Sequence, residues 1–208
     1  MARDQKRGVS QVLRFAVRGP LCRRRVWSFG GAEGKKPSQV HGTDSISISA
    51  ATRDDVPVIL AFIRGLAEYE KLAHACVATE EALRRTLFGD RPAAEVLIAR
   101  SDETPVGFAL FFQSYSTFLA KPGIYLEDLF VLPEHRGRGA GKALLARIAQ
   151  IAQDRDCGRL EWSVLDWNAP AIGFYQRLGA TVMPDWHICR MTPTEFGRLA
   201  DSGGGGEP

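Results

Sequence analysis

Apolar residues after position 44 follow two spacings, an alternation in some segments and a helical period in others. The alternating segments and short apolar runs predict strands at 45–49, 94–100, 105–116, 123–132, 159–165 and 186–192. The connection between the second and third of these strands is too short for a crossover. We therefore expect those two strands to form a hairpin.

Helical spacing fills the stretches between the strands and predicts four helices. Two precede the hairpin, a third follows the fourth strand, and a short fourth comes after the fifth. Capping residues mark three starts and one end, at Thr52 and Asp54, Thr79, Asn168 and Gly179. The apolar faces of the first three helices are Val58, Phe62, Leu66 and Tyr69, then Leu83 and Leu87, then Leu144, Leu145, Ile148, Ile151 and Ala152.

The resulting order, β α α β β β α β α β, predicts an α+β (α/β) fold with one mixed central sheet. A chain of 208 residues with 45% hydrophobic and 25% charged residues supports a single core of ordinary size. We expect that domain at residues 45–200. Residues 1–44 are expected to be a basic, disordered extension and residues 201–208 a flexible, glycine-rich tail.

Positive charge is concentrated in the first 44 residues, where ten lysines and arginines face three acids, a local balance of +7. The formal net charge of the whole chain is +3, so residues 45–208 balance at −4. The basicity therefore does not indicate a nucleic-acid surface on the folded part. The extension fits a dispensable segment or a targeting peptide, although no hydrophobic stretch of secretory length follows its arginines.

The four cysteines, Cys22, Cys76, Cys157 and Cys189, stand far apart, and the sequence has neither a CxxC pair nor a Cys/His cluster. It therefore predicts no metal site and no disulfide framework. No run of 18 apolar residues occurs, so no membrane-spanning helix is expected. These features favour a reducing, cytoplasmic compartment, with neither a nucleic acid nor a membrane as partner.

A glycine-rich turn joins the fourth strand to the third helix within the stretch EDLFVLPEHRGRGAGKALLARI, Glu127–Ile148. Unpaired backbone N–H groups at the start of a helix form an anion site. Gly137, Gly139 and Gly141 allow the backbone to approach a ligand closely. The turn is therefore a candidate site for a phosphate-bearing ligand, and the alternative is a turn that only reverses the chain.

Spacing separates the known nucleotide-binding turns. A Rossmann fingerprint read from Gly137 requires glycine where Lys142 stands. A P-loop requires serine or threonine where Ala143 stands. The pattern that remains is R-x-x-G-x-G, from Arg136 to Gly141.

This turn, with the stretches YLEDLFVLPEHRGRGAG, DWNAPAIGFYQRLGA and LAEYEK, resembles the GNAT superfamily of N-acetyltransferases. Within it the chain is similar to the diamine acetyltransferases of the spermidine/spermine type. The resemblance extends from Ser45 to Leu199. It implies the GNAT fold, in which acetyl-CoA lies between splayed strands, here Gly123–Leu132 and Arg159–Leu165. It also implies a homodimer, with Trp186–Leu199 as the expected contact.

The resemblance implies a site for acetyl-CoA as co-substrate. Backbone N–H groups from Arg138 to Lys142 can cradle its pyrophosphate, helped by the guanidinium of Arg136 or Arg138. The residues implied to bind acetyl-CoA are Leu129, Phe130, Val131, Arg136, Gly137, Arg138, Gly139, Ala140, Gly141, Lys142, Asn168 and Tyr175.

Acetylation of an amine requires a proton to leave the amine. An alkyl amine with a pKa of about 10.4 is mostly charged at neutral pH. Glu127 and Asp128 are adjacent on a predicted strand, so we expect their side chains to point to opposite faces. The resemblance implies that Glu127 is the base, acting through water, and that Asp128 holds the cationic acceptor. The alternative for either carboxylate is a purely structural role, in an ion pair with an arginine or as the cap of a turn.

The leaving thiolate requires a proton in turn, and a tyrosine hydroxyl can donate it. The resemblance places this acid at Tyr175, for which core packing is the alternative. Asn168 caps the fourth helix and can also bond the pantetheine arm.

The stretch LAEYEK carries the acceptor side of the resemblance, which implies that Glu70 meets the amine. Simple solvation of this glutamate is the alternative. The chain departs from the resemblance at Lys71, where these enzymes often carry an aromatic residue, and at Ala169, where they carry an acidic one. Both departures bear on the choice of acceptor.

The predicted function is therefore direct acetyl transfer from acetyl-CoA to a primary amine, with a diamine, polyamine or lysine-like small molecule as acceptor. The alternatives are a protein lysine or N-terminal acetyltransferase, and a non-catalytic acyl-CoA-binding module. No cysteine is required as a nucleophile.

Overall fold

The computed structural model describes residues 45–203; our predictions for residues 1–44 and 204–208 lie outside this range. The sheet has five strands in the spatial order β1-β2-β3-β4-β5. The first four are antiparallel to their neighbours, and β5 runs parallel to β4. The strands are β1 Ile46–Ala50, β2 Glu95–Ser101, β3 Thr104–Ser116, β4 Lys121–Val131 and β5 Leu160–Trp162.

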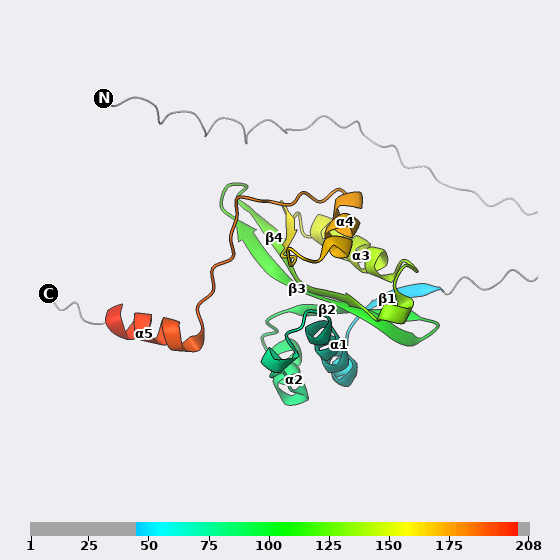
Figure 1. The fold of residues 1–208 in the computed structure, drawn as a ribbon, viewed down its shortest axis with the longest axis horizontal. Helices are drawn as coiled ribbons and strands as arrows, with labels where there is room; N and C mark the ends of the chain where they lie inside the picture. The colour runs from blue at the N-terminus through cyan, green and yellow to red at the C-terminus, as the bar shows by residue number, and fades with distance from the viewer. Residues whose placement is uncertain (1–44, 204–208) are drawn as a thin grey trace, which may run out of the picture. The chain divides into compact units, whose positions relative to one another are not determined.

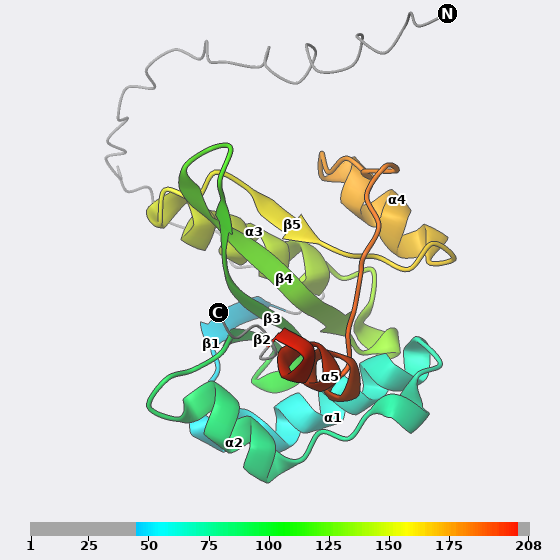
Figure 2. The same ribbon diagram turned by 90° about the vertical axis from the view of Figure 1, so that its left-hand side faces the viewer.

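Helices cover both faces of this sheet (Figures 1 and 2). Helices α1 (Val56–Tyr69) and α2 (Glu80–Phe88) pack on one face, where the core includes Phe62, Phe108 and Phe130. Helix α3 (Ala140–Asp154) packs on the other face, where the core includes Leu126, Leu144 and Ile148. The remaining helices are α4 Ala169–Arg177, α5 Pro193–Gly203 and short 3-10 turns at Arg53–Asp55, Ala73–Ala75 and Pro133–His135. None of the helices within residues 45–203 has the length and apolar content needed to cross a membrane.

The capping residues expected from the sequence begin and end these helices. The Thr79 hydroxyl accepts a hydrogen bond from the Ala82 amide at 3.2 Å at the start of α2. Asn168 caps α4, and Gly179 takes a φ of +95° after its end. Before α1, Thr52 caps the 3-10 turn Arg53–Asp55, and the residue at the N-cap of α1 is Asp55 rather than the expected Asp54. The Asp55 carboxylate accepts a hydrogen bond from the Thr52 amide at 2.7 Å.

The predicted last strand, 186–192, is wrong for the described chain. Every residue from 181 to 192 is exposed, and none of them belongs to a strand. A strand requires a partner for its backbone N–H and C=O groups. Within residues 45–203 this segment pairs with no strand, and β5 remains the edge of the sheet. Helix α5 follows instead and extends three residues into the segment that we expected to be a flexible tail.

Two irregularities of β4 shape the middle of the fold. Asp128 pairs with Leu110 and Leu126 with Phe111, which leaves Glu127 as an extra residue without a partner on β3. This arrangement is a β-bulge, and a bulge bends the strand that carries it. On the other edge β5 pairs with β4 only at Ile124–Leu126. The two parallel strands therefore part at the level of the bulge, as the predicted splay of 123–132 and 159–165 required.

Candidate active site

One pocket of about 520 Å³ lies where β4 and β5 part. Its wall is formed by the second half of β4, the segment after β5, the turn before α3, helix α4 and the end of α1. Of the predicted site residues, all but Arg138 line it. These are Glu70, Glu127, Asp128, Leu129, Phe130, Val131, Arg136, Gly137, Gly139, Ala140, Gly141, Lys142, Asn168 and Tyr175.

The turn before α3 presents a row of free donors. Gly137 and Gly139 have φ values of +76° and +96°, a conformation that glycine adopts without strain. The N–H groups of Gly139, Ala140, Gly141 and Lys142 donate to no backbone acceptor within residues 45–203. These groups stand at the positive end of α3 and can receive the oxygens of a pyrophosphate.

The alternation of β4 changes phase at the bulge, which corrects our expectation for Glu127 and Asp128. Before the bulge, Leu126 faces the α3 core; after it, Leu129 and Val131 pack against that core, and Phe130 faces α1 and α2. Simple alternation would have placed Phe130 with Leu126. Glu127 and Asp128 lie between Leu126 and Leu129, which both face the α3 core, so the two carboxylates lie on the same side of the strand. Both line the same pocket.

A third carboxylate, Glu70 at the end of α1, lines the pocket with this pair. Burial raises the pKa of the Asp128 carboxyl to about 6, and the charges of Glu127 and Glu70 add to that effect. Burial also raises the pKa of Glu70. None of the three carboxylates forms an ion pair within the described residues. The part of the pocket formed by these three carboxylates thus concentrates negative charge that a cation can neutralise.

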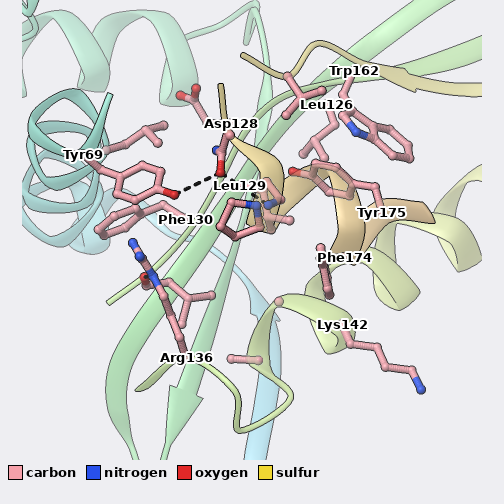
Figure 3. A pocket seen from close by; sticks show the side chains of 18 of the residues that line it. Tyr69, Leu126, Asp128, Leu129, Phe130, Arg136, Lys142, Trp162, Phe174 and Tyr175 are labelled. Atoms are coloured by element: carbon pink, nitrogen blue, oxygen red, sulfur yellow. Dashed lines mark hydrogen bonds between the residues drawn. The ribbon is translucent and has the colours of Figure 1, made fainter. Parts of the chain in front are cut away.

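Tyr175 projects from α4 into the pocket (Figure 3). Its ring packs against Trp162, with ring centres 4.9 Å apart, and against Phe174, at 5.3 Å. Burial and the charge of Glu70 raise the pKa of the Tyr175 hydroxyl to about 12, so the hydroxyl is protonated at neutral pH. It can therefore donate a proton or a hydrogen bond to a group in the pocket.

A contact that the sequence did not reveal joins α1 to α4. The Tyr69 hydroxyl donates to Oδ1 of Asn168 at 3.0 Å, and the same oxygen accepts from the Ala171 amide at 3.3 Å (Figure 3). Asn168 is buried, so both bonds are shielded from water. Tyr69 was assigned only to the apolar face of α1, and hydrophobic spacing gives no sign of its polar tip.

Arg136 is fixed by three contacts at the start of the turn. Its Nε donates to the Val131 carbonyl at 2.9 Å. Its guanidinium lies 4.6 Å from the centre of the Tyr69 ring and 5.7 Å from that of Phe130. Arg136 therefore braces the turn against α1 and β4, besides any contact it makes with a phosphate.

Among residues 45–203, no three His, Cys, Asp or Glu side chains group as a metal-ligand set.

The raised pKa of Asp128 predicts a cost in stability that appears as pH rises. A folded-state pKa of about 6, above the ordinary value of 3.8 for an aspartate, means that ionisation of Asp128 destabilises the fold. We expect Asp128→Asn to be more stable than the wild type by up to about 3 kcal/mol at pH 7.5, from 1.36 kcal/mol per pKa unit. The difference should shrink towards zero near pH 4. Urea unfolding at both pH values measures it.

The exposed Asp156, which pairs with Lys121, supplies a control. Asp156→Asn should show no gain in stability that grows with pH. A gain for Asp128→Asn of the same size at pH 4 and pH 7.5 would contradict the raised pKa.

Comparison with known proteins identifies the family of the chain. The model of the acetyltransferase (GNAT) family matches residues 53–180. The chain is 39% identical over 166 residues to the thialysine N-epsilon-acetyltransferase of Bos taurus, covering 74% of this chain and 97% of that protein. It is 36% identical over 190 residues to the L-ornithine N5-acetyltransferase NATA1 of Arabidopsis thaliana, covering 70% and 83%.

The fold is shared with solved structures. An integron cassette protein from the mobile metagenome of V. cholerae superposes with a TM-score of 0.64 at 24% identity, covering 75% of this chain and 98% of that one. The match to the family model, residues 53–180, includes the glycine turn, the three carboxylates and Tyr175. The chain belongs to the acetyltransferase (GNAT) family, and it is an N-acetyltransferase.

Proposed function

We propose that the protein transfers the acetyl group of acetyl-CoA to a primary amine of a small cationic acceptor, a diamine, a polyamine or a lysine-like molecule. The observation that carries this proposal is the pairing of two opposite features in one pocket. A row of free N–H donors lies at one side, and Glu70, Glu127 and Asp128 lie at the other. An anionic coenzyme and a cationic acceptor are the ligands that suit these two features.

The turn supports the coenzyme half of the proposal. A Cβ atom on Gly137 or Gly139 would meet no atom within 4 Å, so the space in front of the turn is open to a ligand. The pyrophosphate would bond the N–H groups from Gly139 to Lys142, and the thioester would lie between the parted strands. The positive end of α3 adds to the attraction.

The carboxylates support the acceptor half. They would attract the ammonium form of the amine, and a carboxylate must then accept its proton before attack. Asp128, with a pKa of about 6, is matched to this transfer near neutral pH. Glu127, which the resemblance indicates as base, lies beside it, and its charge adds to the effect of burial in raising the pKa of Asp128. We propose that the two act as one coupled unit.

The chemical step is direct. The amine nitrogen attacks the thioester carbonyl, the C–N bond forms, the C–S bond breaks, and the thiolate leaves. Tyr175 would donate a proton to the leaving sulfur, and Asn168 and Tyr69 would hold α4 so that this hydroxyl stays in place. The protein lysine or N-terminal acetyltransferase remains the alternative, and peptide substrates in the same assay distinguish it.

Thiol release from acetyl-CoA with spermidine, thialysine, L-lysine and a lysine peptide tests the activity. We expect turnover with the small acceptors spermidine, thialysine or L-lysine and little with the peptide.

Tyr175→Phe should lower kcat about 100-fold or more, the range of general acid catalysis. Its dissociation constant for CoA, measured by calorimetry, should change little. Tyr115→Phe, at an exposed position of β3, is the matched control. It should change neither kcat nor the dissociation constant for CoA. Equal losses of turnover and CoA binding in Tyr175→Phe would remove the acid role.

We also infer that the protein is a homodimer of the cytoplasm. The support for a dimer is the exposure of large apolar side chains after α4, where Trp186 is 74% and Ile188 is 70% exposed. Phe196 and Leu199 of α5 are exposed as well. A second copy would cover them. The support for a reducing compartment is that Cys76, Cys157 and Cys189 are free thiols.

Light scattering coupled to size exclusion tests the dimer. The wild type should elute as a dimer at micromolar concentration, and Trp186→Ser with Ile188→Ser should shift it towards the monomer. Val77→Ser, which removes an equally exposed apolar side chain between α1 and α2, should leave the dimer intact. A wild type that is monomeric throughout the micromolar range would refute the inference.

A further inference from the structure

The chain leaves helix α1 through a lysine in an unusual conformation. Lys71 has a φ of +62°, in the left-handed region. Its amide donates to the Glu68 carbonyl at 3.1 Å, and the Leu72 amide donates to the Ala67 carbonyl at 2.7 Å. This pair of bonds ends many helices, and glycine normally occupies the residue with positive φ. A residue with a side chain is strained there, so the backbone conformation of Lys71 is unfavourable.

The Lys71 ammonium has a defined place. It lies 5.6 Å from the centre of the Trp167 ring, in a cation–π contact. That ring packs against Tyr69, with ring centres 6.0 Å apart. Glu70 and Asn168, the sequence neighbours of Lys71 and Trp167, both line the pocket. The lysine and the tryptophan do not line the pocket themselves; each stands one residue outside it, beside Glu70 and Asn168, and we call this margin the rim.

The charge at this rim is opposite to the charge inside. Glu70, Glu127 and Asp128 favour a cation in the pocket, whereas Lys71 disfavours a second cation beyond it. A polyamine carries only ammonium groups along its length. A lysine-like amino acid carries an ammonium and a carboxylate at the end remote from the reacting amine. Only the second kind of acceptor offers each protein charge an opposite partner.

We propose that Lys71, held over Trp167, forms a distal subsite for the carboxylate of amino-acid acceptors and so selects lysine-like molecules over polyamines. This inference rests on the proposed transfer of an acetyl group to a small amine. A second cation, Arg136, lies near Tyr69, but its Nε is occupied by the Val131 carbonyl. Substitutions at Lys71 leave Arg136 in place, so they isolate the contribution of Lys71.

L-lysine and cadaverine test the subsite, because they differ only by the carboxylate. The measured quantity is the ratio of kcat/KM for L-lysine to kcat/KM for cadaverine. We expect Lys71→Met to lower this ratio about three- to fivefold, the upper range for a solvent-exposed charge pair. Lys71→Glu should lower it further, and Lys71→Arg should preserve it. The wild-type ratio should also fall as salt is raised from 20 mM to about 0.5 M.

Two further variants keep the test decisive. Lys71→Gly removes the charge and suits the left-handed backbone, so it should fold and lower the ratio as Lys71→Met does. Lys121→Met removes a lysine at the far end of β4, about 23 Å from Asp128 for seven residues at about 3.3 Å each. This variant should leave the ratio unchanged. A purely structural role of Lys71 would change both substrates equally.

Each outcome has one meaning. Normal turnover with an unchanged ratio in Lys71→Met, Lys71→Gly and Lys71→Glu overturns the subsite and leaves the proposed function intact. A wild-type enzyme that acetylates neither L-lysine, cadaverine nor spermidine overturns the proposed function, and the subsite falls with it.

Discussion

One extra residue in β4 determines the character of the pocket. Glu127 has no partner on β3, and the alternation of the strand changes phase there. Asp128 consequently shares its orientation with Phe130, on the side of α1, where Glu70 ends the helix. Without the bulge, Asp128 would face the apolar core beneath α3, where an unpaired carboxylate is costly. The bulge thus makes it possible for three carboxylates to share a site.

The same level of the sheet supplies the rest of the pocket. Because β5 pairs with only three residues of β4, the space beyond Leu126 is free of a neighbouring strand. The turn before α3 enters one side of it with free N–H groups, and α4 enters the other with Tyr175. The bond from Tyr69 to Asn168 ties these parts together. The glycine turn, Tyr175 and the three carboxylates therefore all lie around the one place where β4 and β5 part.

Local signals in the sequence predicted much of this arrangement. Five of the six strands, the first four helices and the caps at Thr79 and Asn168 follow from spacing and side-chain chemistry within short windows. The glycine turn followed in the same way. The bulge did not, because it depends on which residues of β3 oppose β4, and alternation alone assigned Glu127 and Asp128 to opposite faces. The prediction for 186–192 was wrong because a strand-like pattern forms a strand only when it pairs, and local spacing does not tell whether the segment docks on the free edge of β5.

The bulge couples Asp128 to Glu127 in a partly buried site. Carbon-13 NMR of the aspartate carboxyl groups, assigned to Asp128 by comparison with Asp128→Asn, measures this without reference to catalysis. The account predicts a pKa of about 6 for Asp128 in the wild type. In Glu127→Gln the pKa should fall but remain above the ordinary range, because burial is the larger cause. An Asp128 that titrates near 4 in both proteins would contradict the account.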